Sequence, residues 1–174
     1  MQRTGRLNLM SDSKNILVVC TGNICRSPMA EYLLRARLPA TGQWQVASVG
    51  LAAADGQPAS APALEVLAEQ GIDATAHRSR MVRREWLEQA AYVLVMTRGH
   101  SAAILAQWPE FADKVYLIAG FGPEGEVPDI ADPIGQSTAV YRQVADQLKD
   151  AIDDFILYLA DRGEIDSRQQ RERT

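Results

Sequence analysis

The chain has 174 residues, of which 47% are hydrophobic and 23% are charged, so it can form one domain with a sizeable buried core. Lys and Arg total 18 against 22 Asp and Glu, and this net charge of −4 gives no general footprint for nucleic acid. No apolar run approaches the roughly 18 residues of a membrane span, and the first residues lack the apolar core of a secretory signal. These features predict a cytoplasmic protein without a nucleic-acid or membrane partner.

The chain contains two cysteines, Cys20 and Cys25, and two histidines, His77 and His100. These are too few for a disulfide scaffold, a four-cysteine zinc site or a histidine-rich metal centre. In a compartment that keeps thiols reduced, we expect the cysteines to be reactive or buried rather than bridged.

The first predicted element is a strand over 15–20, because this segment is apolar on both faces and rich in β-branched residues. A Thr-Gly-Asn turn follows, and Pro28 then opens a helix over 29–38, since proline is tolerated in the first helical turn. A second strand is predicted over 44–49.

The next helix is predicted to have Ser60 as its cap and to end before Gly71. The later predicted elements are a short helix over 83–89, a strand over 92–96, a helix over 100–107, a strand over 114–118, a loop over 120–137 and a long helix over 138–159. This alternation predicts a single α/β domain over 14–160, with a parallel sheet and helices on both faces. Residues 1–13 are expected to be a flexible extension, in which Met10 is an alternative start, and 161–174 a charged tail.

The loop after the first strand is a candidate site, because ligands bind beyond the carboxyl ends of parallel strands. It reads C-T-G-N-I-C-R-S, so five residues separate Cys20 from Arg26. Such a loop can turn its backbone N–H groups inward around an anion, Gly22 allows it unusual backbone conformations, and Arg26 matches two phosphate oxygens. These surroundings favour a thiolate, which predicts a phosphate cradle with Cys20 as an in-line nucleophile. The alternative is one buried cysteine and one surface arginine.

A thiolate nucleophile needs an acid that protonates the departing oxygen. Asp132 is the best candidate, because Pro133 biases it away from helical geometry and stiffens the loop over 120–137. Asp129 is a rival acid in the same loop, and a simple Asp-Pro turn is the alternative to both.

The segment C-T-G-N-I-C-R-S-P-M-A-E over 20–31, with D-P at Asp132, resembles the low-molecular-weight protein tyrosine phosphatases in their bacterial form. The resemblance covers about residues 14–160 and implies a four-stranded parallel sheet, a cysteinyl-phosphate intermediate and no metal or organic cofactor. It implies that Cys20 is the nucleophile, that Arg26 binds phosphate and steadies the transition state, and that Asp132 acts as acid and then as base. The implied phosphate-binding residues are Thr21, Gly22, Asn23, Ile24, Cys25 and Arg26.

The resemblance also implies a support network around the nucleophile. Ser27 would hydrogen-bond to the thiolate, and Asn23 would shape the loop by bonding to Ser27, Ser48 and His77. Cys25 would be a redox partner that forms a disulfide with Cys20 and blocks its deeper oxidation. The alternatives are ordinary satisfied polar groups for Ser48 and His77, and a small buried side chain for Cys25.

The sequence departs from the animal members of the family at the walls of the substrate pocket. No aromatic residue follows the D-P pair, where Ile134 stands, or occurs over 51–56, and Thr21 replaces a larger apolar residue. Bacterial relatives that act on phosphoarginine resemble a version of this motif in which Thr stands at the position of Ile24. Because Ile24 offers an apolar wall and no hydroxyl, it favours phosphotyrosine, and phosphoarginine is the alternative. The expected partner is a phosphotyrosine-containing protein, with a bacterial tyrosine kinase as one candidate.

Two other function classes share this type of loop. Arsenate reductases coupled to thioredoxin need a further cysteine pair, and no cysteine follows Cys25. A non-enzymatic anion-binding module would not need both Cys20 and Asp132. The sequence therefore favours a phosphatase over both.

Overall fold

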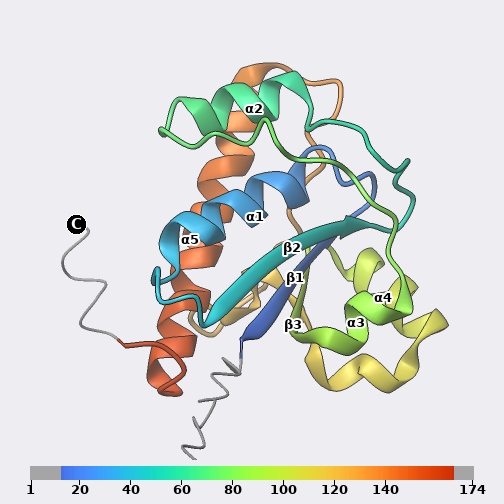
Figure 1. Cartoon of the computed structure of the whole chain (residues 1–174), viewed down its shortest axis with the longest axis vertical. Coiled ribbons are helices and arrows are strands. Elements are labelled where there is room, and N and C mark those ends of the chain that lie inside the picture. The colour runs from blue at the N-terminus through green and yellow to red at the C-terminus, as the bar shows by residue number, and fades with distance from the viewer. Residues whose placement is uncertain (1–12, 167–174) are drawn as a thin grey trace, which may run out of the picture.

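The computed structural model describes residues 13–166, in which one sheet lies between two layers of helices (Figure 1). The strands are β1 (Lys14–Cys20), β2 (Trp44–Gly50), β3 (Ala90–Val95) and β4 (Val115–Leu117). All pairings are parallel, in the order β2-β1-β3-β4. The predicted four-stranded parallel α/β fold is confirmed, and β1 lies inside the sheet with a neighbour on each side.

The sheet is covered by helices on both faces. The helices are α1 (Arg26–Arg37), α2 (Ala61–Ala68), α3 (Arg84–Gln89), α4 (Arg98–Gln107) and α5 (Thr138–Asp161), with 3-10 turns η1 (Pro109–Lys114) and η2 (Ile118–Phe121). One apolar cluster joins the sheet to α1, α2 and α5, and a second joins it to α3 and α4. Among residues 13–166, no helix is long and apolar enough to cross a membrane.

Strand β1 is buried on both faces, as its uninterrupted apolar pattern predicts. Ile16 and Val18 belong to the cluster under α1 and α5, whereas Leu17 and Val19 belong to the cluster under α3 and α4. Since side chains alternate along a strand, Cys20 falls on the α1 face, where only 2% of it is exposed. The alternation of side chains along β1 therefore places the Cys20 thiol on a buried face, at the start of the following loop.

Helix α1 begins at Arg26, three residues before the predicted start at residue 29. Pro28 sits inside the first turn, which it can do because first-turn N–H groups have no partner within the helix. This correction places Arg26 and Ser27 on the helix itself. Ser60 is the N-cap residue of α2, as predicted, and its carbonyl accepts from Leu64 N at 3.0 Å. Its hydroxyl makes no capping bond to a helix N–H group and instead accepts from Cys25 Sγ at 3.4 Å.

The far end of the sheet is closed by the residues after α5. Glu164 accepts hydrogen bonds from the Tyr92 hydroxyl at 2.6 Å and from the Lys14 ammonium at 2.9 Å, and Ile165 is buried. The chain therefore packs against the sheet as far as this turn. Residues 1–12 of the expected extension and residues 167–174 of the expected tail lie outside the described residues.

Candidate active site

The loop that joins β1 to α1, residues 20–26 and here called the cradle loop, has its carbonyl groups hydrogen-bonded to the surrounding chain. The bonds run to Cys20 O from Leu51 N, to Thr21 O from Ala52 N, to Asn23 O from His77 Nε2, to Ile24 O from Ser60 N and to Cys25 O from Met29 N. Across a trans peptide, the C=O of one residue and the N–H of the next point in opposite directions. The N–H groups after these carbonyls therefore face the inside of the loop. Together with the N-terminus of α1 they form a cradle for an anion.

Asn23 fixes the shape of this loop. Its backbone has φ +57°, in the left-handed region that asparagine tolerates better than most residues, whereas Gly22 does not adopt a positive φ. Its Nδ2 donates to Ser27 Oγ and to Ser48 Oγ, both at 2.8 Å, and its Oδ1 accepts from the backbone N–H of Arg80 at 2.9 Å. The contacts to Ser27, Ser48 and His77 are thus those that the family resemblance implies.

Gly50 lets the end of β2 approach the cradle loop closely. A Cβ atom at this position would lie 2.6 Å from the backbone oxygen of Thr21 and 3.0 Å from the backbone nitrogen of Asn23. Because real Cβ atoms do not approach backbone that closely, a side chain here would push the loop out of place. The loop is therefore supported by backbone contact as well as by hydrogen bonds.

The Cys20 thiol lies at the start of the cradle loop between two polar groups. Its Sγ is 2.9 Å from Ser27 Oγ and accepts from the backbone N–H of Asn23 at 3.3 Å. Since Ser27 Oγ already accepts from the Asn23 amide, its own proton is free to be donated to the sulfur. Two groups can therefore donate hydrogen bonds to this sulfur.

Arg26 links the cradle loop to the long loop that precedes α5. Only 4% of this residue is exposed. Its Nη1 donates to Ile130 O at 2.9 Å, and its Nη2 donates to Asp132 Oδ2 at 3.2 Å. A guanidinium has five N–H donors, so three remain beyond these two contacts. Arg26 can therefore hold the second loop and still bind the oxygens of an anion.

Residues 122–137, here called the acid loop, place Asp132 at the opening of the cradle. The side chain of Asp132 is 42% exposed, and its Oδ1 accepts from the N–H of Ile134 at 3.1 Å. Ile130 anchors the loop, because it is buried and its N–H donates to Met96 O at 2.9 Å. The rival acid, Asp129, is instead bonded to the backbone and the side chain of Arg98. The geometry brings Asp132, rather than Asp129, to Arg26.

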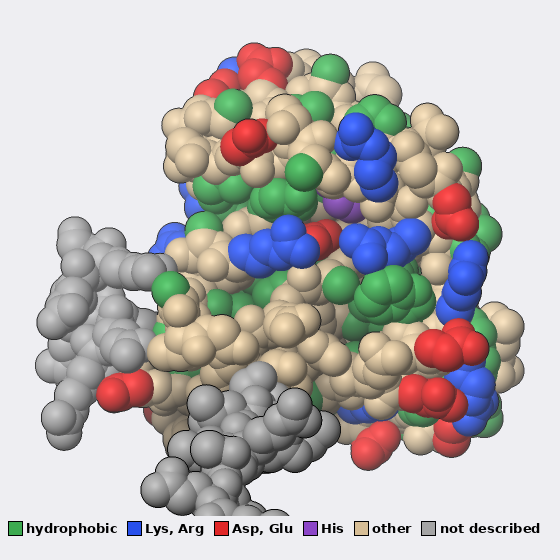
Figure 2. Space-filling view, in the orientation of Figure 1, with side chains coloured by type: hydrophobic (Ala, Val, Ile, Leu, Met, Phe, Trp, Pro, Cys, Tyr) green, Lys and Arg blue, Asp and Glu red, His purple; other side chains and the backbone are tan. Residues whose placement is uncertain are grey.

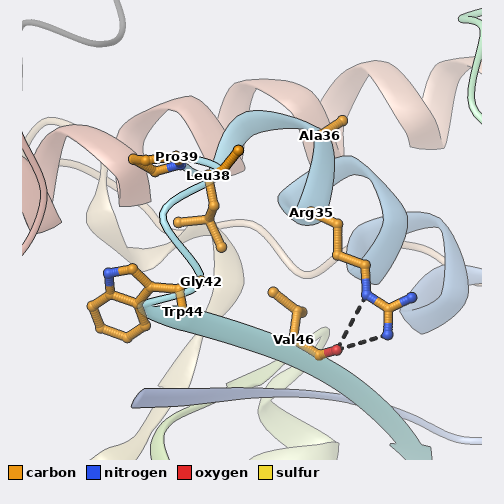
Figure 3. Close-up of a pocket in the computed structure, with 8 residues that line it drawn as sticks. Arg35, Ala36, Leu38, Pro39, Gly42, Trp44 and Val46 are labelled. Atoms are coloured by element: carbon orange, nitrogen blue, oxygen red, sulfur yellow. Dashed lines mark hydrogen bonds between the residues drawn. The ribbon is translucent and has the colours of Figure 1, made fainter. Parts of the chain in front are cut away.

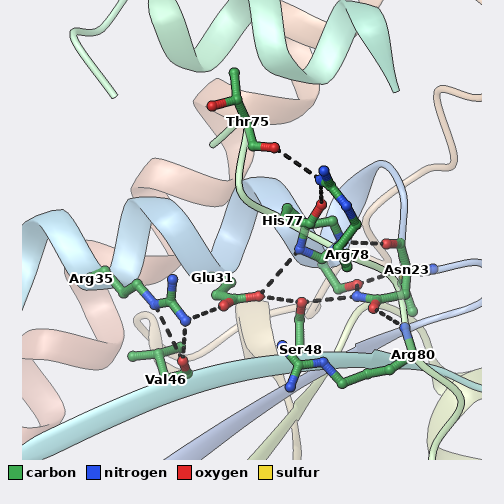
Figure 4. A network of polar contacts seen from close by, with 11 residues as sticks. Asn23, Glu31, Arg35, Val46, Ser48, Thr75, His77, Arg78 and Arg80 are labelled. Carbon is green, nitrogen blue, oxygen red and sulfur yellow. Dashed lines mark hydrogen bonds and ion pairs between the residues drawn. The ribbon is translucent and has the colours of Figure 1, made fainter. Parts of the chain in front are cut away.

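Glu31 belongs to the site, although sequence reasoning assigned it no role. It is 1% exposed, and its Oε2 accepts from the Ser48 hydroxyl and lies 3.8 Å from His77 Nδ1 (Figure 4). Its Oε1 pairs with Arg35 one turn further along α1. Burial lowers the pKa of His77, although the bond to the Asn23 carbonyl and the nearby Glu31 act in the opposite direction. The signal in the sequence was a carboxylate four residues after Ser27, on the inner face of the helix.

His100 is a second residue beside the cradle loop to which sequence reasoning assigned no role. Its Nε2 lies 2.9 Å from the hydroxyl of Thr21, the residue after Cys20. Its Nδ1 is buried and has no hydrogen-bond partner in the part of the chain that the structure describes. Burial, with a smaller contribution from the positive charge of Arg26, lowers the pKa of His100 to about 4. The imidazole next to the cradle loop is therefore neutral at physiological pH.

The second cysteine has a different environment from the first. Cys25 Sγ lies 3.1 Å from the Tyr141 hydroxyl and 3.4 Å from Ser60 Oγ. Burial raises the pKa of the Cys25 thiol, and burial with the contact to Cys25 raises the pKa of Tyr141 to about 12. Both cysteines are free thiols, so the predicted disulfide between Cys20 and Cys25 stays a prediction. Within residues 13–166, no group of three or more His, Cys, Asp or Glu side chains is arranged to hold a metal ion.

The fold and the site together define an α/β protein whose first loop is an oxyanion cradle that carries a cysteine and an arginine. A family model described as low molecular weight phosphotyrosine protein phosphatase matches residues 15–168. The chain belongs to this family of hydrolases, and the resemblance seen in the sequence is confirmed.

The names of the relatives refer to two different substrates, phosphoarginine and phosphotyrosine in proteins. A protein-arginine-phosphatase from Geobacillus stearothermophilus is 46% identical over 141 residues, which cover 79% of this chain and 90% of the relative. A probable low molecular weight protein-tyrosine-phosphatase, EpsP from Ralstonia solanacearum, is 36% identical over 143 residues, covering 82% and 94%. The solved structure of a low molecular weight protein tyrosine phosphatase from T. tengcongensis has a TM-score of 0.78 and 43% identity, covering 84% of this chain and 100% of that chain.

Proposed function

We propose that the protein hydrolyses phosphotyrosine in proteins through a cysteinyl-phosphate intermediate. The observation that carries this proposal is the convergence of three groups, since the Cys20 sulfur, the inward N–H groups of the cradle loop and the Arg26–Asp132 pair meet at one end of β1. A thiol, an anion cradle and an exposed carboxyl group are the three parts that phosphoryl transfer to sulfur requires.

In the first step, the Cys20 thiolate attacks phosphorus, the bond from phosphorus to the tyrosine oxygen breaks, and Asp132 gives its proton to that oxygen. In the second step, Asp132 takes a proton from water, whose oxygen attacks phosphorus, and the bond from sulfur to phosphorus breaks. Ser27 donates to the sulfur as it regains its negative charge. Arg26 binds the equatorial oxygens with the N–H groups that its contacts to the acid loop leave free.

The substrate class follows from the apolar side chains at the opening. Ile24 is half-buried in the cradle loop, and Ile134 beside the acid is 56% exposed. Apolar side chains in these positions suit an aromatic ring better than a guanidinium group. We infer a phosphotyrosine-containing protein as the partner, with a bacterial tyrosine kinase as a candidate, and the cytoplasm as the compartment. Phosphoarginine is the second candidate substrate, because a relative named protein-arginine-phosphatase is 46% identical to this chain.

The experiment compares turnover of matched phosphotyrosine, phosphoserine and phosphoarginine peptides by the wild type and by Ile24→Thr. We expect the wild type to prefer phosphotyrosine, and Ile24→Thr to lose phosphotyrosine turnover and to gain on phosphoarginine. Cys20→Ser is the control, because it should remove both activities. A wide preference of the wild type for phosphoarginine would reverse the order of the two candidates.

We further propose that Cys25 protects the nucleophile by disulfide formation. Peroxide would oxidise Cys20 to a sulfenic acid, and the Cys25 thiol would displace water to form the S–S bond. The expected defect of Cys25→Ser is slower recovery of activity when a thiol reductant is added after peroxide, with near-normal activity before it. Equal recovery in the two proteins would show that Cys25 is a buried side chain without this role.

A further inference from the structure

A pocket lies behind the cradle loop, between α1 and residues 76–80 of the segment that joins α2 to α3. It is an open pocket of about 480 Å³, lined by Arg35, Arg78 and Arg80, with the buried Glu31 and His77 on its inner side (Figure 4). The same face of the molecule carries Lys and Arg side chains around a hollow in which a histidine is visible (Figure 2). The pocket is thus a cationic feature on a chain whose net charge is −4.

Two of the arginines in this pocket have no acidic partner. The Arg78 guanidinium donates to the backbone oxygens of Thr75 and His77, and that of Arg80 stacks 5.0 Å from the ring centre of Trp86. Neither forms an ion pair with any carboxylate of residues 13–166. Their remaining N–H groups are therefore available to an anion from solution.

The carboxylates at the pocket do not cancel this charge. Glu31 is buried and already paired with Arg35. Asp55, which is exposed, accepts from the N–H of Met81 at 2.7 Å and lies 3.6 Å from Arg83. Glu31 thus pairs with Arg35 and Asp55 with Arg83, so neither carboxylate occupies the N–H donors of Arg78 or Arg80.

The size and chemistry of the pocket fit a phosphate-bearing small molecule. Its volume of about 480 Å³ lies in the range of roughly 300–1,000 Å³ that small-molecule sites have. Arginine binds phosphate through two parallel N–H groups, and two such side chains can share one phosphate. We propose that this pocket binds a phosphate-bearing ligand, and that the bound ligand slows the phosphatase from there.

The polar contacts on the inner side of the pocket lead to the nucleophile. Arg35 pairs with Glu31, whose other oxygen accepts from the Ser48 hydroxyl (Figure 4). Ser48 Oγ accepts from the Asn23 amide, which also donates to Ser27 Oγ, and that oxygen lies 2.9 Å from Cys20 Sγ. An unbroken series of contacts therefore joins the pocket to the thiol.

An anion in the pocket would act on this series through Arg35. Arg35 cannot easily move away, because its Nε and Nη2 donate to Val46 O at 3.3 and 2.9 Å (Figure 3). An anion that also binds Arg35 would weaken the pairing of Arg35 with Glu31. Glu31 would then accept a stronger hydrogen bond from the Ser48 hydroxyl. Ser48 then draws the Asn23 amide away from Ser27, which weakens the support of the thiol. This regulatory effect rests on the proposed function of Cys20, whereas the binding itself does not.

The hollow on the other side of Arg35 lacks these features. It has a volume of about 540 Å³ at the end of α1, and among the residues that line it only Arg35 is charged (Figure 3). Two unpaired guanidinium groups therefore distinguish the proposed site from a hollow of similar size.

The binding test is a titration of the full chain with inorganic phosphate and, separately, with phenylphosphonate, followed by backbone amide NMR. We expect saturable shifts in two groups of signals, over 20–26 from the active site and over 76–80 from the pocket. The variant R78Q/R80Q should weaken the second response at least about tenfold and keep the first. R84Q/R142Q, which removes two arginines elsewhere on the surface, should keep both. If R78Q/R80Q does not fold, R80Q alone is used, since the Arg80 guanidinium stacks on Trp86 and forms no ion pair among residues 13–166.

The two probes distinguish the source of the ligand. Equal affinities at 76–80 indicate that the phosphate group alone is recognised, and tighter binding of phenylphosphonate indicates an organic phosphate. Absence of saturable shifts over 76–80 in the wild type, or their full retention in R78Q/R80Q, overturns the proposal. Neither result bears on the aryl-phosphatase activity, so the two proposals can fail separately.

The regulatory effect is measured by inhibition kinetics with phenylphosphonate and an aryl phosphate substrate. The wild type should show mixed inhibition, because the pocket lowers kcat while the cradle competes with substrate. R78Q/R80Q should show purely competitive inhibition, and R84Q/R142Q should behave as the wild type. Competitive inhibition in all three proteins would show that the pocket does not act on Cys20.

Discussion

The loop that holds Cys20 and the loop that holds Asp132 meet at Arg26, but they are held in different ways. In the cradle loop, successive backbone carbonyls are bonded to the surrounding chain, and Asn23 is buried at its centre. In the acid loop, Asp132 is exposed and depends on its contact with Arg26 and on the anchor at Ile130. The Cys20 thiol is thus held by a loop with many backbone bonds, whereas Asp132 is held by few contacts; if Cys20 is the proposed nucleophile, it is placed before the substrate arrives.

This difference predicts that changes in the two loops have different consequences. A defect in the cradle loop should affect every substrate, because the attack on phosphorus is common to all. A defect in the acid loop should depend on how strongly the leaving oxygen needs a proton.

The largest effect is expected for Cys20→Ser, which should abolish turnover of any aryl phosphate because the covalent intermediate cannot form. The fold and the binding of anions should persist, since the cradle is built from backbone groups and Arg26. Activity with nitrophenyl phosphate and binding of phosphate by NMR are the measurements. Substantial activity in this variant would contradict the assignment of Cys20, and Cys25→Ser is the matched control.

Asp132→Asn should slow phosphotyrosine cleavage by about 10²–10⁴-fold, the usual contribution of a general acid. Cleavage of nitrophenyl phosphate should suffer far less in the phosphorylation step, because nitrophenolate leaves without a proton more easily than a phenol with a pKa of about 10. The basic limb of the pH profile should also disappear. Single-turnover kinetics with both substrates measure the effect.

Asp129→Asn is the control for this variant, because Asp129 lies in the same loop but bonds to Arg98. It should leave the dependence on the leaving group unchanged. If Asp129→Asn shows that dependence and Asp132→Asn does not, the acid is assigned to the wrong aspartate.

Asn23→Ala should lower both stability and activity, because the side-chain amide bonds are lost and a non-glycine residue remains at φ +57°. The buried groups left without partners cost about 1–3 kcal/mol in the free energy of unfolding. Asn23→Gly separates the two causes, since it relieves the backbone strain but also lacks the amide. Urea unfolding and kcat/KM with two substrates are the measurements, and a loss that differs between leaving groups would contradict the contrast.

The smallest effect is expected from the pH dependence of stability. Because the pKa of His100 falls to about 4 in the folded protein from about 6.5 in the unfolded chain, the unfolded state binds more protons between these values. This contribution is present above about pH 6.5 and is lost as the pH falls towards about 4. His77 adds to it with the same sign.

His100→Gln, which can still bond to Thr21, should therefore lose less stability than the wild type between about pH 7.5 and pH 5. Urea unfolding at both pH values measures the difference. Identical losses in the two proteins would show that His100 is not held neutral by its surroundings.

The sequence by itself determined the parts of this protein that depend on residues close together in the chain. The strand before Cys20, the five-residue spacing to Arg26 and the first-turn tolerance of Pro28 are local properties that predicted the cradle loop. The alternation of strand and helix patterns along the chain predicted the α/β fold. Asp132 could be proposed as the acid because its loop follows a strand of the same parallel sheet, whose carboxyl ends share one edge.

Only the tertiary structure decided which distant side chains complete the site. Glu31 meets Ser48, Thr21 meets His100, and Cys25 meets Tyr141 across separations of 17, 79 and 116 residues. None of these pairs has a spacing or composition that predicts contact, because each depends on how helices pack over the sheet. The same is true of the pocket behind the cradle loop, whose arginines come from two segments brought together by that packing. Local pattern therefore predicted the loop that carries Cys20 and Arg26, and packing decided which side chains surround that loop.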